Sequence, residues 1–243
     1  MKILSIGNSF SQDAHRWLHQ LAKLNGHDFY TIDLYVSGCS LQTHWEDYLA
    51  GNAASSLEIN GNLGDTFVTV ADALKMEDWD IVTLQQASPL SGKWESYEPY
   101  LSNLAQVVKT ACPNAQIYFH QTWAYEKDAT YSGYKHYDND QQKMYNGILD
   151  ASEKAGKKLG APLIPVGRII QGLRENLPEF DYGNGGRSLN RDGFHLTYDY
   201  GRFAAAATWI KKITGKDVFA KEFEGFDPAI LEKICNFVNK EVK

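Results

Sequence analysis

Two short stretches near opposite ends of the chain carry residue types that together suit nucleophilic catalysis. Ser9 lies in the stretch GNSF, and Asp192 and His195 lie in the stretch DGFH. A serine hydroxyl becomes a good nucleophile when a base takes its proton, and histidine is the side chain best suited to this near neutral pH. An acidic group on the second ring nitrogen holds the histidine in the required tautomer. Because Asp192 precedes His195 by three residues, one turn of loop can present both groups to Ser9.

The same chemistry needs hydrogen-bond donors where negative charge develops on the substrate carbonyl oxygen. We expect the backbone amides of Ser9 and Gly38 and one side-chain amide to supply them. Ser9 follows an apolar run that is typical of a buried strand, and a helical pattern begins soon afterwards. A serine on such a strand-to-helix turn can stand clear of the sheet edge beside the amides of the helix N-terminus.

The elements that would position these residues alternate between strand and helix. Short apolar and β-branched runs predict five strands, at residues 3–6, 29–36, 80–84, 116–120 and 162–166. Helical spacing of apolar residues predicts helices at 13–24, 43–49, 66–75, 97–111, 139–159, 168–176, 198–213 and 228–242. Residues 51–64 are predicted to form a loop or a short hairpin that turns at Asn60-Gly61.

This alternation predicts an α/β fold, a three-layer α/β/α sandwich with a five-stranded parallel sheet. No linker or repeat divides the chain, so we expect residues 1–243 to form a single domain. Ligands of such sheets bind at the carboxyl ends of the strands. The residues of interest follow predicted strands or lie on the loop before a late helix, so we expect them at one edge: Ser9, Gly38, Gln85, Gln86, Trp123, Tyr125, Asp192 and His195.

Composition narrows the class of protein. A hydrophobic content of 43% and a charged content of 22% are typical of a soluble globular protein. The net charge of −6 argues against a nucleic-acid partner, and no apolar run is long enough to span a membrane. Met1 and Lys2 lead directly into the first predicted strand, which predicts a cytoplasmic protein as the sequence is written. The alternative is a periplasmic or secreted protein whose export signal has been removed.

No metal or cofactor site is predicted. His15 and His19 lie four residues apart on one helix face, but no acidic or thiol ligand accompanies them. The glycines at 183–186 lack the Lys-Ser/Thr pair that follows a phosphate-binding loop. The three cysteines are widely spaced and odd in number, so they predict neither a disulfide framework nor a metal site. His120 is expected to be a hydrogen-bonded core residue rather than a substrate contact.

The chain resembles the SGNH (GDSL-type) hydrolase superfamily, whose four sequence blocks occur in this order. GNSF at residues 7–10 matches the first block, with Asn8 where the superfamily more often has Asp. Gly38 matches the glycine of the second block, and DGFH at residues 192–195 matches the D-x-x-H block. The third block departs from the pattern, because Gln86 stands where the superfamily places an Asn.

The resemblance implies a flavodoxin-like fold and a role for each matched residue. Ser9 would be the nucleophile, His195 the general base and acid, and Asp192 its orienting partner. The amides of Ser9 and Gly38 and the side chain of Gln86, or less readily Gln85, would form the oxyanion hole. The implied reaction is hydrolysis of a carboxylic ester through an acyl-serine, without a metal or cofactor.

The expected substrate is a small-molecule ester, an acetylated or otherwise acylated sugar. Flat aromatic rings stack on sugars, so Trp123 and Tyr125 are predicted to bind it, together with Asn8 and Gln85. Tyr131 and Tyr134 are further candidates for this aromatic lining, and the alternative is that these rings simply pack under a loop. One alternative is a carbohydrate-binding protein with this fold and little or no turnover, which the glutamine in the third block suggests. A second alternative, a nucleotide- or flavin-binding protein, requires a G-x-G-x-x-G turn that the first strand lacks.

Overall fold

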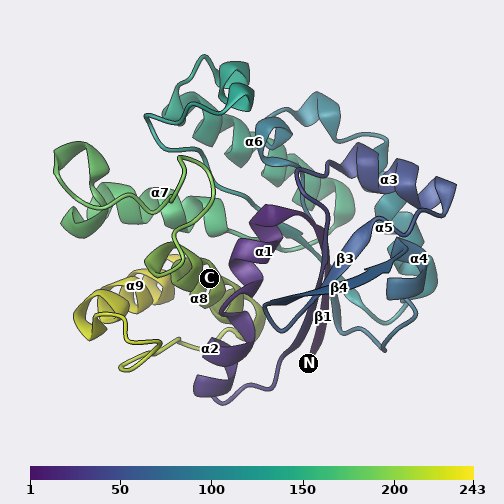
Figure 1. Ribbon diagram of the computed structural model, residues 1–243, viewed down its shortest axis with the longest axis horizontal. Helices are drawn as coiled ribbons and strands as arrows, with labels where there is room; N and C mark the ends of the chain where they lie inside the picture. The colour runs from purple at the N-terminus through teal and green to yellow at the C-terminus, as the bar shows by residue number, and fades with distance from the viewer.

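The computed structural model describes residues 1–243 and has a central β-sheet flanked by helices (Figure 1). The sheet has seven strands in the order β4-β3-β2-β1-β5-β6-β7. Its strands are β1 Lys2–Gly7, β2 Tyr30–Tyr35, β3 Ser55–Ile59, β4 Asn62–Val68, β5 Ile81–Leu84, β6 Gln116–His120 and β7 Leu163–Ile164. The predicted fold class, an α/β sandwich, is therefore confirmed.

The predicted number of strands was too small because a hairpin extends the sheet. The five strands β2, β1, β5, β6 and β7 are all parallel, as predicted. Beyond β2, strands β3 and β4 add an antiparallel pair. Asn60 and Gly61 form its turn with φ values of 51° and 77°, a conformation that Asn and Gly favour. Strand β4 continues to Val68, so the helix predicted at 66–75 is only the short α4, Val70–Ala73.

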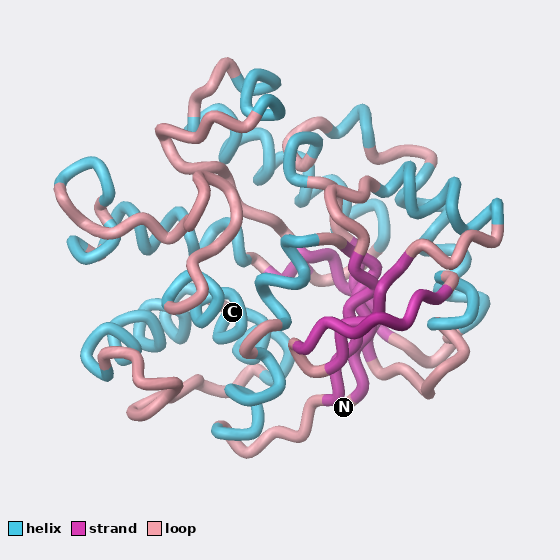
Figure 2. The backbone as a smooth tube through the Cα atoms, viewed as in Figure 1, coloured by secondary structure: helices cyan, strands magenta, loops and turns pink.

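The helices cover both faces of the sheet (Figures 1 and 2), because each parallel crossover places a helix against one face. Their bounds are α1 Ser9–His15, α2 Leu18–Leu24, α3 Leu41–Ala50, α4 Val70–Ala73, α5 Tyr100–Ala111, α6 Gln141–Leu159, α7 Val166–Asn176, α8 Tyr200–Thr214 and α9 Pro228–Glu241. The helix predicted at 13–24 is in fact two, α1 and α2, and α1 already begins at Ser9. None of the helices combines the length and apolar character needed to cross a bilayer.

Two hydrophobic cores lie on opposite faces of the sheet. Alternate residues of β1 reach them: Ile3 belongs to the core under α1, α2, α8 and α9, and Leu4 to the core under α3, α4 and α5. Both side chains are fully buried, as expected for a parallel strand covered on two faces. This double burial fixes β1, and with it the start of α1, at the centre of the molecule.

Candidate active site

Ser9 is the first residue of α1, directly after the turn that follows β1. Asn8 caps this helix: its Oδ1 accepts a hydrogen bond of 2.9 Å from the Phe10 amide. The Asn8 amide donates in return to Ser11 Oγ at 2.9 Å, which completes a capping box. A Cβ on Gly7 would lie 2.1 Å from Ser11 Oγ, so the turn has room only for glycine there. The Ser9 hydroxyl is thus held at the N-terminal end of a helix, where the first amides have no intrahelical partner.

The structure brings Ser9, His195 and Asp192 into one hydrogen-bonded chain. Ser9 Oγ lies 2.9 Å from His195 Nε2, and His195 Nδ1 lies 2.7 Å from Asp192 Oδ2. Residues 186 positions apart in sequence therefore meet as the motif spacing suggested. Such a chain can transfer the serine proton to the imidazole while the carboxylate stabilises the imidazolium.

The loop that carries Asp192 and His195 is a tight turn closed by the acidic side chain. Asp192 Oδ1 accepts hydrogen bonds from the amides of Phe194 and His195, at 3.1 and 2.8 Å. Gly193, which lies between Asp192 and Phe194, has a φ of +87°, a conformation that residues with a side chain rarely adopt. Partial burial pulls the pKa of Asp192 upward, but the bonds from the His195 ring and the two amides outweigh it and hold the pKa below its usual range. Asp192 is therefore a carboxylate at neutral pH.

Asp13, which the sequence analysis missed, ties this loop to helix α1. Its side chain is completely buried and accepts hydrogen bonds from Arg191 Nη1 at 3.0 Å and from Arg202 Nε at 2.7 Å. The Leu196 amide donates to it as well, at 2.7 Å. Asp13 lies one helical turn after Ser9, and its partners flank the DGFH loop, so it ties helix α1 and Ser9 to the loop that carries His195. The sequence signal was present: an acid four residues after Ser9 and an arginine directly before Asp192.

Asn8 and Gln85 form a buried polar chain under the serine turn. Gln85 Nε2 donates to Asn8 Oδ1 at 2.8 Å, and His120 Nδ1 lies 2.6 Å from Gln85 Oε1. Burial lowers the pKa of His120 to about 3, so the ring is neutral and donates to Gln85 from Nδ1. Asn8 Nδ2 also donates to Cys39 O, at 2.9 Å, which ties down the turn containing Gly38. Asn8 and Gln85 are both buried, so they support the turn and do not present a binding surface.

The Gln86 side chain is engaged away from the serine turn. Its Nε2 donates to the carbonyl and the hydroxyl oxygen of Ser96, each at 3.1 Å, and its Oε1 accepts from the Leu41 amide at 3.1 Å. Both polar ends of the amide are therefore occupied in this conformation. Gly38, in contrast, is exposed in a turn with φ +64° beside the tethered Cys39.

Trp123 and Tyr125 are both fully buried, which corrects the prediction that they contact substrate directly. Trp123 stacks on Phe10 with ring centroids 4.2 Å apart, and its Nε1 donates to Phe194 O at 2.7 Å. The Tyr125 hydroxyl lies 2.7 Å from Ser88 Oγ. These side chains fill the space beneath the DGFH loop because large aromatic residues gain most from complete burial.

A different aromatic pair lies at the surface beside the imidazole. The Phe194 ring lies 4.1 Å from the His195 ring and stacks on Tyr131 with centroids 4.7 Å apart. Tyr131 is 40% exposed, and Phe194 is partly exposed. This pair occupies the place expected of an aromatic lining. Sequence alone could not distinguish it from the buried pair because all four rings lie in similar aromatic-rich segments.

No group of three or more His, Cys, Asp or Glu side chains is arranged to hold a metal ion. His15, one of the two helical histidines, is completely buried, with its Nε2 2.8 Å from Ser5 Oγ.

Comparison with solved structures places the fold among the SGNH hydrolases. A protein from Slackia heliotrinireducens described as a candidate SGNH hydrolase aligns with a TM-score of 0.59 at 22% identity, covering 88% of this chain and 98% of that one. An acetyl xylan esterase, AlAXEase, aligns with a TM-score of 0.58 at 16% identity, covering 86% and 98%. The chain therefore has the α/β fold of the SGNH (GDSL-type) hydrolases.

The sequence also matches a family that is narrower than this fold. Residues 2–235 match the model of a domain of unknown function, DUF4886. A DUF4886 protein from Bacteroides uniformis is similar over 99% of this chain and 93% of that one, with 35% identity and a TM-score of 0.89. The chain belongs to the DUF4886 family. No curated protein matches it.

Proposed function

We propose that this protein is a serine-dependent ester hydrolase that removes a small acyl group, such as acetyl, from a carbohydrate. The observation that carries the proposal is the chain from Ser9 Oγ through His195 to Asp192, with links of 2.9 and 2.7 Å. Both distances are already within hydrogen-bond range without a substrate. The fold shared with an acetyl xylan esterase supports the same reaction class.

In the first half of the reaction, Ser9 Oγ attacks the ester carbonyl while His195 Nε2 takes its proton. The amides of Ser9 and Gly38 stabilise the oxyanion of the tetrahedral intermediate. Its collapse breaks the bond to the sugar oxygen, which leaves with the proton from His195. Water then attacks the acyl-serine by the same route, releasing the acid and restoring Ser9.

An aromatic surface beside the imidazole supports a carbohydrate as the alcohol part of the substrate. The exposed rings of Tyr131 and Phe194 offer flat surface on the side of His195, where the alcohol leaves. Aromatic faces of this kind suit the apolar faces of sugar rings.

Hydrolysis of p-nitrophenyl esters of increasing chain length tests this proposal. We expect turnover of the acetate to exceed that of the octanoate, and Ser9→Ala or His195→Ala to lower kcat by about 10³-fold or more. Preference for the octanoate would contradict the small acyl group. Turnover that survives both substitutions would exclude Ser9 as the nucleophile.

A binding protein without turnover is the second candidate, because the Gln86 amide is committed to Ser96 instead of the proposed oxyanion hole. The loss of one donor typically costs about 10²–10³ in rate. A wild-type protein that binds acetylated sugars and hydrolyses no ester would favour this candidate.

A further inference from the structure

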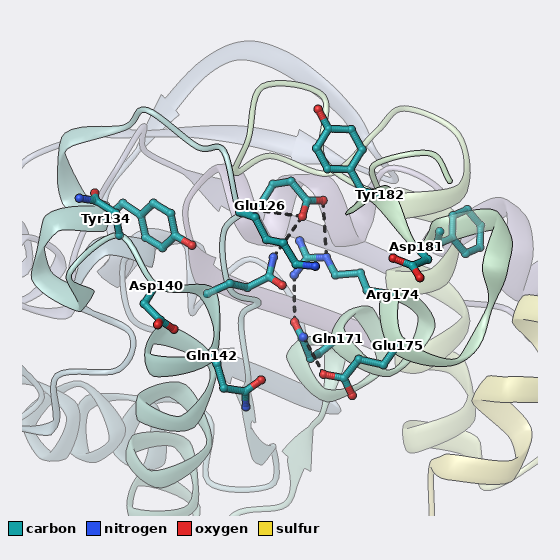
Figure 3. A pocket seen from close by; sticks show the side chains of 13 residues that line it. Glu126, Tyr134, Asp140, Gln142, Gln171, Arg174, Glu175, Asp181 and Tyr182 are labelled. Atoms are coloured by element: carbon teal, nitrogen blue, oxygen red, sulfur yellow. Dashed lines mark hydrogen bonds and ion pairs between the residues drawn. The ribbon is translucent and has the colours of Figure 1, made fainter. Parts of the chain in front are cut away.

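A cavity of about 420 Å³ lies apart from Ser9, between the segment after β6 and the end of α7 (Figure 3). This volume is in the range of about 300–1,000 Å³ that is usual for small-molecule sites. Figure 3 shows Tyr134 and Asp140 on one side of the cavity and Asp181 on the other, with Glu126 and Arg174 between them. Its lining is mainly polar, with three hydrophobic residues among thirteen.

A buried ion pair with one unused donor forms the floor of this cavity. Glu126 and Arg174 have side chains only 3% and 5% exposed, and Arg174 Nε lies 3.8 Å from Glu126 Oε2. Both Arg174 Nη atoms donate to Ala124 O at 3.1 Å, while Nε has no hydrogen-bond partner. Glu126 is held by Gln141 Nε2 at 3.1 Å and Ser188 Oγ at 2.7 Å. The charges of the pair largely cancel, but the Nε–H of Arg174 has no acceptor within hydrogen-bond distance, since Glu126 Oε2 is 3.8 Å away.

The Tyr134 hydroxyl is a second buried group without a partner in the wall of the same cavity. Burial and the nearby Asp140 carboxylate raise its pKa to about 12, so it is a hydroxyl donor at neutral pH. Native proteins leave few buried polar groups unpaired, because each one destabilises the fold. Two donors without a protein partner therefore belong to residues that line one cavity, where the oxygens of a bound ligand would satisfy them.

The charges around the cavity decide what kind of ligand brings these oxygens. Four acidic and two basic residues line it, which gives a formal charge of −2: Glu126, Asp140, Glu175, Asp181, Lys127 and Arg174. This balance opposes an anion. An ammonium ion would suit the carboxylates but has no lone pair for Tyr134 or Arg174. A neutral hydroxyl group can accept from the two donors and donate to the carboxylates at the same time.

A second cavity lies between this region and the catalytic loop. It has a volume of about 250 Å³ and shares Glu126 and Tyr182 with the first cavity. Its lining also includes Asp192 and Gly193, the residues that precede the imidazole. The Tyr182 hydroxyl is held by Asp128 Oδ2 at 2.9 Å, and its ring is 41% exposed, which leaves an aromatic surface at the junction.

From these observations we infer that the two neighbouring cavities bind the neutral saccharide part of the substrate, with sugar hydroxyls pairing with Tyr134, Arg174 and the carboxylates around them. The inference rests on the proposed function, since the second cavity is lined by Asp192 and Gly193 of the catalytic loop. The substrate class is then an oligosaccharide, because both cavities lie beyond the immediate surroundings of Ser9, Tyr131 and Phe194.

Calorimetric titration of the Ser9→Ala protein tests this inference without turnover. The probes are neutral oligosaccharides of two to four units, built from xylose, glucose, mannose, galactose or N-acetylglucosamine, with a glucuronic acid oligosaccharide and spermidine as charged comparisons. We expect at least one neutral probe to bind and the charged probes to bind more weakly. Tyr134→Phe in the same background should weaken the binding about 5- to 20-fold. Because it removes an unpaired hydroxyl, it should leave Tm unchanged or raise it.

Tyr137→Phe is the matched control, since Tyr134 and Tyr137 lie on the same short 3₁₀ helix, Ser132–Tyr137. The Tyr137 hydroxyl is paired with the Gly92 amide at 2.8 Å and does not line the cavity. This variant should lose stability and keep its affinity within about twofold of the parent, as a purely structural hydroxyl would. A Tyr134→Phe protein that behaves like it, with lower Tm and unchanged affinity, contradicts the inference.

The two proposals fail in different ways. If the wild type hydrolyses p-nitrophenyl acetate but no neutral probe binds, or a charged probe binds best, the saccharide site is wrong and the esterase stands. If a neutral probe binds and Tyr134→Phe weakens it while no ester is hydrolysed, the saccharide site stands and the enzyme proposal is wrong.

Discussion

Asp13 and Asp33 are both buried beside helix α1, but their surroundings differ. Asp13 lies on the helix and is paired with Arg191, Arg202 and a backbone amide. Asp33 lies on β2, directly opposite Glu58 of β3 in the sheet register, and neither of its carboxylate oxygens has a hydrogen-bond partner. The first carboxylate is neutralised by arginines, whereas the second shares its site with another carboxylate.

Two kinds of buried acid therefore lie beside helix α1: a carboxylate paired with arginines, and a carboxylate that faces another carboxylate. Burial, followed by the Glu58 carboxylate, raises the pKa of Asp33 well above its usual range. Burial likewise raises the pKa of Glu58 to about 7, although Gln12, Arg202 and Arg16 oppose this shift and Asp13 adds to it. The pair of Asp33 and Glu58 therefore keeps a proton at neutral pH, which reduces the repulsion between the two carboxylates. Asp13 instead holds the DGFH loop through its ion pairs with the two arginines.

The largest effect is expected from removing the charge of Asp13. Asp13→Asn leaves two largely buried guanidinium groups without their carboxylate, which typically costs about 3–5 kcal/mol. The loop that carries His195 loses its anchor, and misplacement of a catalytic group by about 1 Å can lower kcat about 10²-fold. Urea unfolding and p-nitrophenyl acetate hydrolysis measure the two effects.

Asp150→Asn controls for the loss of an ordinary ion pair. Asp150 pairs with Lys154 at the surface of α6, where both side chains are about half exposed. This change should cost less than about 0.5 kcal/mol and leave kcat unchanged. Equal effects of the two substitutions would show that the buried ion pairs of Asp13 stabilise the protein no more than a surface ion pair does.

A change in pH should destabilise the second region selectively. The folded pKa of Glu58, about 7, is higher than its ordinary value of 4.5, so the folded state binds this proton more tightly than the unfolded state. The contribution of Glu58 to the free energy of unfolding is therefore greatest below about pH 4.5, and it decreases as the pH rises toward 7. The expected slope approaches about 1.4 kcal/mol per pH unit within that window.

Glu58→Gln should flatten this slope, since it removes the titrating proton, and should gain stability relative to wild type above pH 7. Denaturant unfolding at several pH values between 5 and 8 measures the difference. Lys2→Met, which removes an exposed ion pair with Glu77, is the control and should keep the wild-type slope. A Glu58→Gln protein with an unchanged slope would show that the pair does not hold the proton.

The smallest effect concerns the turn that joins the two regions. Ser11→Ala removes the hydroxyl that accepts from the Asn8 amide and donates to the Asn8 carbonyl, at 2.9 and 2.8 Å. Loss of such a helix cap typically costs about 1 kcal/mol. Urea unfolding near pH 5 measures this loss of stability, because Asp33 and Glu58 stay protonated at that pH and do not contribute to the difference. Ser102→Ala on the surface of α5 should change stability by less than about 0.5 kcal/mol, and an equal loss there would contradict a capping role.

Several parts of this molecule could be predicted from sequence because their physics is local. The parallel strands are continuous apolar runs, and the Asn60-Gly61 turn has the residues that its positive φ values require. Ser9, His195 and Asp192 could be proposed as partners because the strand-to-helix turn and the D-x-x-H loop each have a recognisable sequence. The hairpin that turns at Asn60-Gly61 was predicted only as an alternative to a loop, and its second strand β4 was predicted too short, because the side chains of β4 are nearly all exposed and show no apolar alternation.

The supporting contacts could not be predicted because they depend on tertiary packing. Gln85 and Gln86 are adjacent and chemically identical, yet one donates to Asn8 and the other to Ser96, since successive side chains leave an extended chain in opposite directions. Trp123 was expected at the surface but is buried on Phe10. A sequence reports that an aromatic ring is present and not which side of a loop it covers.

Labelling with a fluorophosphonate, followed by peptide mapping, tests whether Ser9 is a nucleophile activated by His195. We expect one adduct, on the peptide that contains Ser9, formed at least about 10²-fold more slowly in the His195→Ala protein. An adduct on another residue, or labelling of Ser9 at the same rate without the imidazole, would contradict it.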